Sequence, residues 1–177
     1  MRSDEEFLNK LIYADEAAGL VSSWLGKSGH KTTYNGLVNS DTGRGPRANF
    51  GDESFALPDF MAFKEDGSAA FWVEVKRAST WDWYKNGQVW STGIDGEYYY
   101  DYCNIEDRLS LKVMIYFMMD GGISEHRPKV NSPSGLYGAS LRSLRDIETK
   151  ERFSKPWVFY TINELTFLAS LKELRSE

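Results

Sequence analysis

Residues 57–76 of this 177-residue chain read LPDFMAFKEDGSAAFWVEVK, and the fold is organised around this stretch. Two apolar runs flank a polar turn centred on Asp66 and Gly67, a pattern that predicts a β-hairpin. Side chains alternate between the two faces of a strand, so Glu74 and Lys76 share one face of the second strand. An acid beside a lysine on one face indicates either a solvent-exposed ion pair or a site that lines a cleft.

Three residues of this stretch have the chemistry needed for metal-assisted cleavage of a phosphodiester. The carboxylates of Asp59 and Glu74 would supply hard oxygen ligands, which Mg²⁺ prefers. The metal would lower the pKa of a bound water and neutralise charge on the phosphate. Lys76 would hold or deprotonate that water and attract the scissile phosphate. The stretch therefore predicts Mg²⁺, or Mn²⁺, as a cofactor and assigns catalytic roles to all three side chains.

Pro58-Asp59 and, after the hairpin, Glu74-Val75-Lys76 resemble the two halves of the motif of the PD-(D/E)xK nuclease superfamily. The resemblance extends over residues 4–120 and implies a restriction-endonuclease-like fold, which Holliday-junction resolvases share. It implies a magnesium-dependent endodeoxyribonuclease that hydrolyses DNA, with the carbonyl of Val75 completing the metal shell. Many members of the superfamily act as dimers, so the resemblance includes a homodimer among the expected assemblies.

A first helix, predicted over residues 4–25, carries a further candidate acid. Ser3 and Glu6 have the spacing of a capping box, and apolar residues then recur at intervals of three and four. Members of the superfamily often place a glutamate on this helix that reaches the metal, and the resemblance assigns that catalytic role to Glu16. Asp15 is one alternative, and a solvated acid without a catalytic role is another.

The order of predicted elements indicates an α/β fold with a central mixed sheet flanked by helices. A strand over residues 31–38 and the two strands of the hairpin are followed by a helix that begins at residues 95–97. Residues 112–119 are apolar without alternation, which predicts a strand buried on both faces. The resulting order of helix, three strands, helix and strand is the one that the resemblance implies for the core of the superfamily.

Three further elements are predicted after this core. They are a helix over residues 136–152, a strand over residues 156–162 and a last amphipathic helix that begins at Asn163. The chain is long enough to bury a core and shows no linker, so residues 1–177 are expected to form one nuclease-like domain.

Candidates for contact with nucleic acid are Arg44, Arg47, Arg77, Lys85 and Tyr102. The first two lie in a loop rich in glycine and proline, where they could grip phosphates. Arg77 and Lys85 are candidate phosphate contacts, and they flank a segment with aromatic rings that could stack on bases. Tyr102 lies on the helix after the hairpin, with Tyr98 as the second candidate there. The alternatives are structural: ordinary surface arginines, rings that close the edge of the domain, and tyrosines of the core.

Composition excludes several classes of protein. The single cysteine, Cys103, rules out an intramolecular disulfide and a multi-cysteine zinc site. No apolar run is long enough to span a membrane and the N-terminus lacks the core of a signal peptide, so we expect a cytoplasmic protein without membrane contacts. Residues 1–75 hold 7 Lys/Arg against 12 Asp/Glu, and the net charge is −5. This balance argues against a simple nucleic-acid binder, although bound cations would invert the local field.

Three hypotheses about function therefore remain open at the level of sequence. The first is a metal-dependent nuclease with DNA as its partner. The second is a non-catalytic module on a nuclease-like fold that binds nucleic acid, carbohydrate or protein. The third is that Glu74 and Lys76 form an exposed ion pair of little energetic value. Metal-dependent cleavage, as opposed to metal-independent binding, distinguishes the first two.

Overall fold

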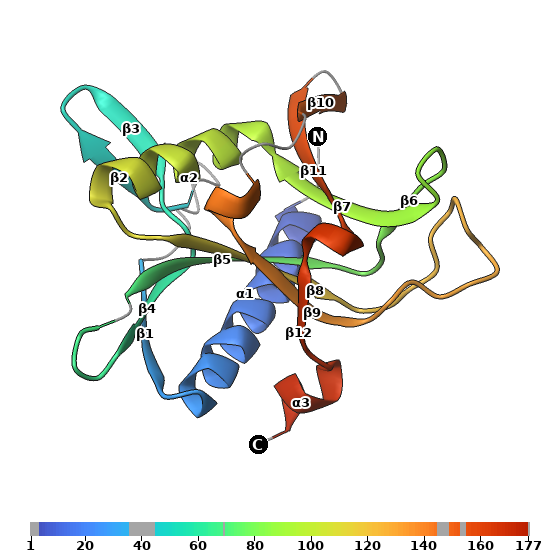
Figure 1. Cartoon of the computed structure of the whole chain (residues 1–177), viewed down its shortest axis with the longest axis horizontal. Helices are drawn as coiled ribbons and strands as arrows, with labels where there is room; N and C mark the ends of the chain where they lie inside the picture. The colour runs from blue at the N-terminus through green and yellow to red at the C-terminus, as the bar shows by residue number, and fades with distance from the viewer. Residues whose placement is uncertain (1–3, 36–44, 69, 145–148, 153–154, 177) are drawn as a thin grey trace.

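The computed structural model describes residues 4–35, 45–68, 70–144, 149–152 and 155–176. Its centre is a mixed six-stranded sheet with the strand order β1-β4-β5-β8-β9-β12 (Figure 1). The strands of this sheet are β1 (His30–Tyr34), β4 (Phe60–Lys64), β5 (Phe71–Ala78), β8 (Val113–Met119), β9 (Gly135–Ser140) and β12 (Thr166–Ala169). The predicted α/β class with a central mixed sheet is confirmed.

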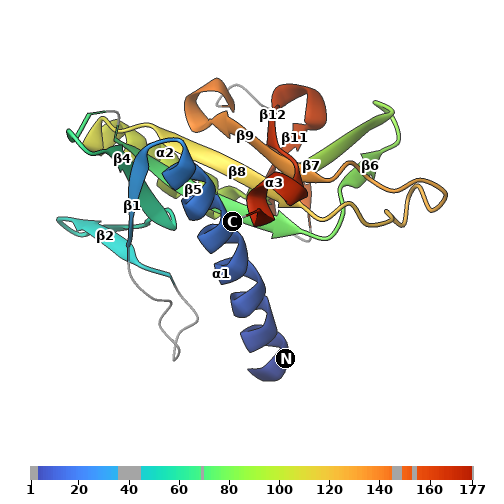
Figure 2. The same ribbon diagram turned by 90° about the horizontal axis from the view of Figure 1, so that it is seen from below.

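Two helices cover opposite faces of this sheet. The side chains of α1 (Asp4–Lys27) form one apolar cluster with Val73 and Val75 of β5. Those of α2 (Gly96–Leu109) form a second cluster with Trp72 on the other face. Successive residues of β8 alternate between the two clusters, so this strand is buried on both faces, as its unbroken apolar run predicted. Figure 2 shows the N-terminal end of α1 projecting away from the sheet.

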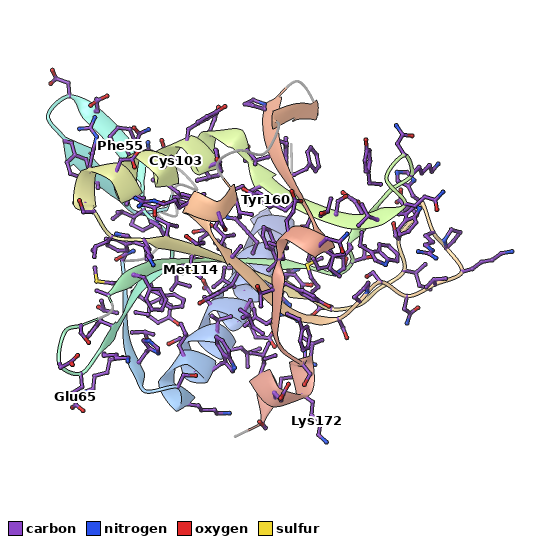
Figure 3. The ribbon with its side chains drawn as sticks, viewed as in Figure 1. Phe55, Glu65, Cys103, Met114, Tyr160 and Lys172 are labelled. Carbon is purple, nitrogen blue, oxygen red and sulfur yellow. The ribbon has the colours of Figure 1, made fainter. Side chains whose placement is uncertain are left out.

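Two smaller sheets complete the described structure. One contains β10 (Thr149–Arg152), β11 (Lys155–Thr161), β7 (Val89–Asp95) and β6 (Asp82–Tyr84), and the other pairs β2 (Arg47–Phe50) with β3 (Glu53–Ala56). The side chain of Asp95 caps α2 by accepting a hydrogen bond from the backbone N–H of Glu97 over 2.9 Å. The ring of Tyr160 is buried, and Cys103 of α2 packs against the same apolar cluster (Figure 3).

The predicted hairpin is present as β4 and β5. Gly67 has a positive φ of 75°, which a glycine adopts without steric cost. The side chain of Asp66 accepts a hydrogen bond from the backbone N–H of Ser68 over 2.9 Å and so stabilises the turn. Glu65 lies at the tip of the hairpin and pairs with Lys31 of β1 at 2.7 Å (Figure 3). The hairpin thus places Asp59, which directly precedes β4, beside Glu74 of β5.

The prediction of a helix over residues 136–152 is wrong. Residues 135–140 form β9, which pairs antiparallel with β8, and a short 3₁₀ turn, η1 (Leu141–Leu144), follows it. The pairing covers the edge of β8, and this long-range contact outweighs the helical spacing of the leucines. A Cβ at Gly138 would lie 2.3 Å from the ring of Tyr116, so only glycine leaves room for that ring.

The last predicted helix is mostly wrong as well. The strand predicted before it is confirmed as β11, but a 3₁₀ turn, η2 (Ile162–Glu164), and β12 occupy the start of the expected helix. The chain becomes helical only in α3 (Leu171–Arg175), where the Ser170 side chain and Glu173 form a capping box. The edge of β9 accepts β12 as its partner, and this pairing interrupts the helical pattern.

The first helix and the first strand also differ in extent from the prediction. The helix predicted over residues 4–25 is confirmed as α1, while Ser3 of the expected capping box lies outside the described residues. The first strand ends at Tyr34, and residues 36–38 of the predicted strand lie outside the described ranges. Among the described residues, no helix is long and apolar enough to cross a membrane.

Candidate active site

Asp59 lies at the point where the pairing of β4 with β5 ends. The ladder between these strands stops at Phe60, which pairs with Val73. Asp59, the next residue towards the N-terminus, uses its side chain instead and accepts a hydrogen bond from the backbone N–H of Val75 over 2.7 Å. The side chain thereby satisfies a backbone group that the sheet leaves open, and it holds the carboxylate beside β5.

Glu74 and Lys76 lie on the face of β5 that is directed towards α2. The side chain of Glu74 is only 3% exposed, whereas that of Lys76 is 38% exposed. The Lys76 ammonium forms an ion pair with Oε1 of Glu74. Because the carboxylate is buried, the pair is not the exposed surface ion pair of the third hypothesis, and that hypothesis is wrong.

The backbone of Val75 faces the side of the sheet on which Asp59 lies. The backbone N–H of Trp72 donates to Lys112, which precedes β8, and the carbonyl of Ala78 accepts from Asp120, which follows it. The backbone N–H and C=O groups of even-numbered residues in β5 therefore point towards β8, and those of odd-numbered residues point towards β4. Since β4 has ended at this level, no residue of β4 pairs with the carbonyl of Val75 there.

Burial and the closeness of the two carboxylates perturb the ionisable groups of the site. Burial, followed by repulsion from Glu74, raises the pKa of Asp59 from 3.8 to about 7. Burial alone would lower the pKa of Lys76, but the attraction of Glu74 and Asp59 outweighs it and raises that pKa to about 12. The site thus combines two carboxylates that repel each other with one permanent cation.

Two tyrosines of α2 form one wall of the site. Tyr102 is 2% exposed and hydrogen-bonds to Glu74; burial and the nearby carboxylates raise its pKa well above 10. Tyr98 is 40% exposed and stacks on Tyr102 with ring centroids 6.2 Å apart. The ammonium of Lys76 lies 5.3 Å from the centroid of the Tyr98 ring, within the range of a cation–π interaction. Tyr102 is thus a buried partner of Glu74, and Tyr98 is the more accessible ring.

All these side chains line one cavity of about 770 Å³. Among the described residues, its polar lining combines acids, one lysine and tyrosines, and the remaining lining is mainly apolar. The lining residues are Leu11, Asp15, Ala18, Tyr34, Gly45, Pro46, Ala56, Leu57, Asp59, Glu74, Lys76, Tyr98 and Tyr102. The structure therefore brings Asp59, Glu74 and Lys76 together at one concave surface.

The two neighbouring acids of α1 point in different directions. Asp15 lines the cavity and contributes to the raised pKa of Asp59, whereas Glu16 pairs with Arg77 at 2.6 Å and does not line the cavity. Asp15 lies four residues after Leu11 and three before Ala18, which also line the cavity. This spacing is the sequence signal that could have identified Asp15, because residues three and four apart share a helix face.

Arg77 is committed to contacts within the protein. Its side chain is 7% exposed and lies between Glu16 and Asp120, with Nη2 at 3.3 Å from Oδ1 of Asp120. The guanidinium also lies 3.8 Å from the centroid of the Tyr13 ring, and the Tyr13 hydroxyl donates to Asp120. The expectation that Arg77 contacts phosphate is therefore replaced by a structural role that attaches α1 to the ends of β5 and β8.

Of the remaining candidates for nucleic-acid contact, Arg47 and Lys85 do not line the cavity. Arg47 lies on β2 and donates to the hydroxyl and carbonyl oxygens of Ser54, and its Nη2 is 3.4 Å from Oδ2 of Asp101. Lys85 is exposed in the turn between β6 and β7. Arg44 lies outside the described residues.

The aromatic segment after β5 is largely part of the core. Trp81 is fully buried, and its indole N–H donates to the carbonyl of Pro133 over 2.8 Å. Trp83 and Trp90 meet edge to face at 4.9 Å, and Arg127 lies 4.0 Å from the centroid of the Trp83 ring. This packing supports the structural alternative for these rings, in which they close an edge of the protein.

The donor set at the cavity fits a hard divalent cation with few protein ligands. The described residues contain no group of three or more His, Cys, Asp or Glu side chains arranged to hold a metal ion. Mg²⁺, however, is often bound through only one or two carboxylates while it keeps several waters. Asp59, Glu74 and the carbonyl of Val75 would provide such a set, and a cation would offset the burial and the repulsion from Glu74 that together raise the pKa of Asp59.

Comparisons with known proteins find similarity among solved structures. The sequence matches no family model and no curated protein. The structure is similar to that of Hjc, a Holliday junction resolvase from the archaeal hyperthermophile Archaeoglobus fulgidus. The two share 13% sequence identity, with a TM-score of 0.48, over 85% of this chain and 89% of that one.

Proposed function

We propose that this protein is a metal-dependent nuclease that hydrolyses phosphodiester bonds of DNA. The observation that carries the proposal is the convergence of Asp59, Glu74 and Lys76 at one cavity, from the end of β4 and from β5. Two oxygen ligands beside a cation are the groups that hydrolysis of a phosphodiester requires. The resemblance of these residues to the PD-(D/E)xK motif supports the same chemistry.

Each residue has a defined role in this proposal. Asp59 and Glu74 would hold the metal through their carboxylates, and the carbonyl of Val75 would contribute a third oxygen. A bound Mg²⁺ would contribute the acidification of water and the neutralisation of phosphate charge. The hydrogen bond from Val75 orients Asp59, while burial behind Tyr102 orients Glu74. Asp15, which lines the same cavity as Asp59, is the acid of α1 that orients water at the site, in place of Glu16.

Lys76 acts as a cation in this mechanism. With a pKa of about 12 it is protonated at neutral pH, so its ammonium donates hydrogen bonds and does not accept a proton. It is paired with Glu74 and lies over Tyr98, and both contacts restrict the position of its Nζ atom. From there it attracts the phosphate and stabilises the negative charge that develops on phosphate oxygens during in-line attack.

A cleavage assay with a matched inactive variant tests the proposal. Purified protein is incubated with supercoiled plasmid, linear duplex, single strands and a four-way junction, in Mg²⁺, Mn²⁺ or EDTA. Glu74→Gln keeps the shape of the side chain but removes its charge. We expect cutting in either metal, none in EDTA and none by the variant. Equal cutting by the variant or in EDTA would disprove the mechanism. Metal-independent binding without any cutting would favour the binding module.

A further inference from the structure

We propose that the cavity accepts an unpaired nucleotide, so that the substrate is single-stranded DNA or a single-stranded segment of a larger DNA. This inference rests on the proposed nuclease function for the identity of the ligand. It is carried by two tyrosine rings, Tyr34 and Tyr98, which line the same cavity as the candidate active-site residues. They are 52% and 40% exposed, so a ligand in the cavity can reach both rings.

The depth of the reactive groups determines what must enter the cavity. Glu74 is 3% exposed, and Asp59 is partly buried beside it. A phosphate that approaches these carboxylates brings its own sugar and base against the cavity walls. The volume of about 770 Å³ is in the range of pockets that enclose a small molecule. The space therefore suits a nucleotide of a flexible strand.

The two rings come from elements that border the cavity on different sides. Tyr34 ends β1 and packs on Phe60, with ring centroids 5.3 Å apart. Tyr98 belongs to the first turn of α2, and the ammonium of Lys76 lies 5.3 Å from its centroid. A phosphate attracted by Lys76 thus places its attached base near an aromatic surface. Stacking of bases on aromatic rings is the usual mode of binding to single strands, and it tolerates any sequence.

The distribution of charge at the cavity also favours an unpaired strand. Within the part of the chain that the structure describes, Lys76 is the one lysine or arginine that lines the cavity. Binding to a duplex depends mainly on many phosphate contacts by cations. Bases of a duplex, moreover, are covered by their stacked neighbours and have to be extruded before a ring can contact them. Stacking is therefore the interaction that this lining offers to a nucleic acid.

Binding in Ca²⁺, measured by fluorescence anisotropy, tests the inference separately from cleavage. Ca²⁺ takes the same oxygen ligands as Mg²⁺, and denaturing gels confirm that the strands stay intact. The probes are a labelled oligodeoxythymidine, a strand of the same length made of abasic residues, and a duplex of mixed sequence. The variants are Tyr34→Leu and Tyr98→Leu, which remove a ring, and Tyr34→Phe and Tyr98→Phe, which keep it. Tyr100→Leu is the control, because Tyr100 is 50% exposed on α2 and does not line the cavity.

We expect the wild-type protein to bind oligodeoxythymidine at least about tenfold more tightly than the duplex or the abasic strand. Each leucine variant should lose about 5- to 100-fold in affinity for the single strand, the range measured for removal of a stacking ring. The phenylalanine variants and Tyr100→Leu should bind as the wild type does. The comparison of natural with abasic strands uses the unaltered protein, so it stays decisive if a variant fails to fold.

Equal binding of the abasic strand, tighter binding of the duplex, or unchanged binding by both leucine variants would overturn the inference. Cleavage in Mg²⁺ separates this failure from failure of the proposed function. Cutting of duplex DNA that depends on Glu74 but not on Tyr34 or Tyr98 would retain the nuclease and reject the single-stranded substrate. Ring-dependent binding of single strands without cutting in Mg²⁺ or Mn²⁺ would support the cavity assignment and reject hydrolysis.

Discussion

The carboxylate of Asp59 accepts a hydrogen bond from the backbone N–H of Val75 across the gap that β4 leaves when it ends. This contact joins the two halves of the sequence motif, which lie 16 positions apart in the chain. A side chain here takes the place of a strand partner, so the loss of pairing does not leave a backbone donor without an acceptor. The same contact holds Asp59 close enough to Glu74 for the two carboxylates to repel each other. The carboxylates of Asp59 and Glu74 therefore repel each other at the cavity, and a bound cation would reduce this repulsion.

Replacing Asp59 by asparagine should stabilise the protein in EDTA at pH 8. The pKa of Asp59 is raised in the folded protein, so the folded state binds more protons than the unfolded state between about pH 4 and pH 7. The stability of the wild type therefore falls as the pH rises through this window. Above it, the charged carboxylate of Asp59 destabilises the folded state. We expect Asp59→Asn to gain about 1–3 kcal/mol at pH 8 and less than about half of that at pH 5, which lies inside the window.

Urea unfolding at the two pH values measures this gain, with Asp52→Asn, in the exposed turn between β2 and β3, as the control. Mg²⁺ should raise the melting temperature of the wild type but not that of Asp59→Asn, because ligands that bind only the folded state stabilise it. An equal response of both proteins to Mg²⁺ would remove Asp59 from the set of metal ligands.

Replacing Lys76 by methionine should lower the rate of cleavage while the protein stays folded. The loss of a cation that stabilises developing charge costs about 10²- to 10³-fold in rate. Glu74 also loses its ion-pair partner in a buried position. The free energy of unfolding of the variant in EDTA should therefore be about 1–3 kcal/mol lower than that of the wild type. Lys76→Arg keeps the positive charge and should recover most of the stability but only part of the rate. Single-turnover cleavage and urea unfolding provide the two measurements, and a normal cleavage rate in Lys76→Met would show that Lys76 has no part in catalysis.

Asp15 and Glu16 form a matched pair for testing which acid of α1 serves the site. Asp15 lines the cavity, whereas Glu16 is 54% exposed and pairs with Arg77. We expect Asp15→Asn to reduce cleavage about 10- to 100-fold, the usual effect of a group that orients the ligands of a metal. Glu16→Gln should leave cleavage unchanged and cost at most about 1 kcal/mol of stability, because its ion pair is largely exposed. The opposite order of effects on cleavage would restore Glu16 as the catalytic acid.

Replacing Arg77 by methionine should destabilise the fold. The guanidinium is 7% exposed and lies between Asp120 and Glu16, so its removal leaves Asp120 without its cation. Breaking a buried ion pair by removing one partner costs about 3–5 kcal/mol, and the partial exposure of both acids places the expected loss near the lower value. Lys85→Met, in an exposed turn, should have no effect on stability. Guanidinium unfolding measures the stability of both variants. A loss of DNA affinity without a loss of stability in Arg77→Met would show that Arg77 contacts phosphate instead.

The central part of the fold could be predicted because its signals are local. The periodicity of residues 4–25, the turn at Asp66 and Gly67, and the apolar run at 112–119 each specify one element without reference to the rest of the chain. The C-terminal third could not be predicted in the same way. Residues 135–140 and 166–169 are strands because they pair with edges of the sheet that exist only after the core has assembled.

The sequence by itself determined the hairpin and the spacing that places Asp59, Glu74 and Lys76 near one another, because strand alternation and a two-strand turn are properties of consecutive residues. Only the tertiary structure decided that Asp15, and not Glu16, lines the cavity. Successive residues of a helix point about 100° apart, and the docking of α1 on β5 selects which of them faces the site. Tertiary structure likewise decided that Arg77 is an internal partner, since its acids come from α1 and from the end of β8.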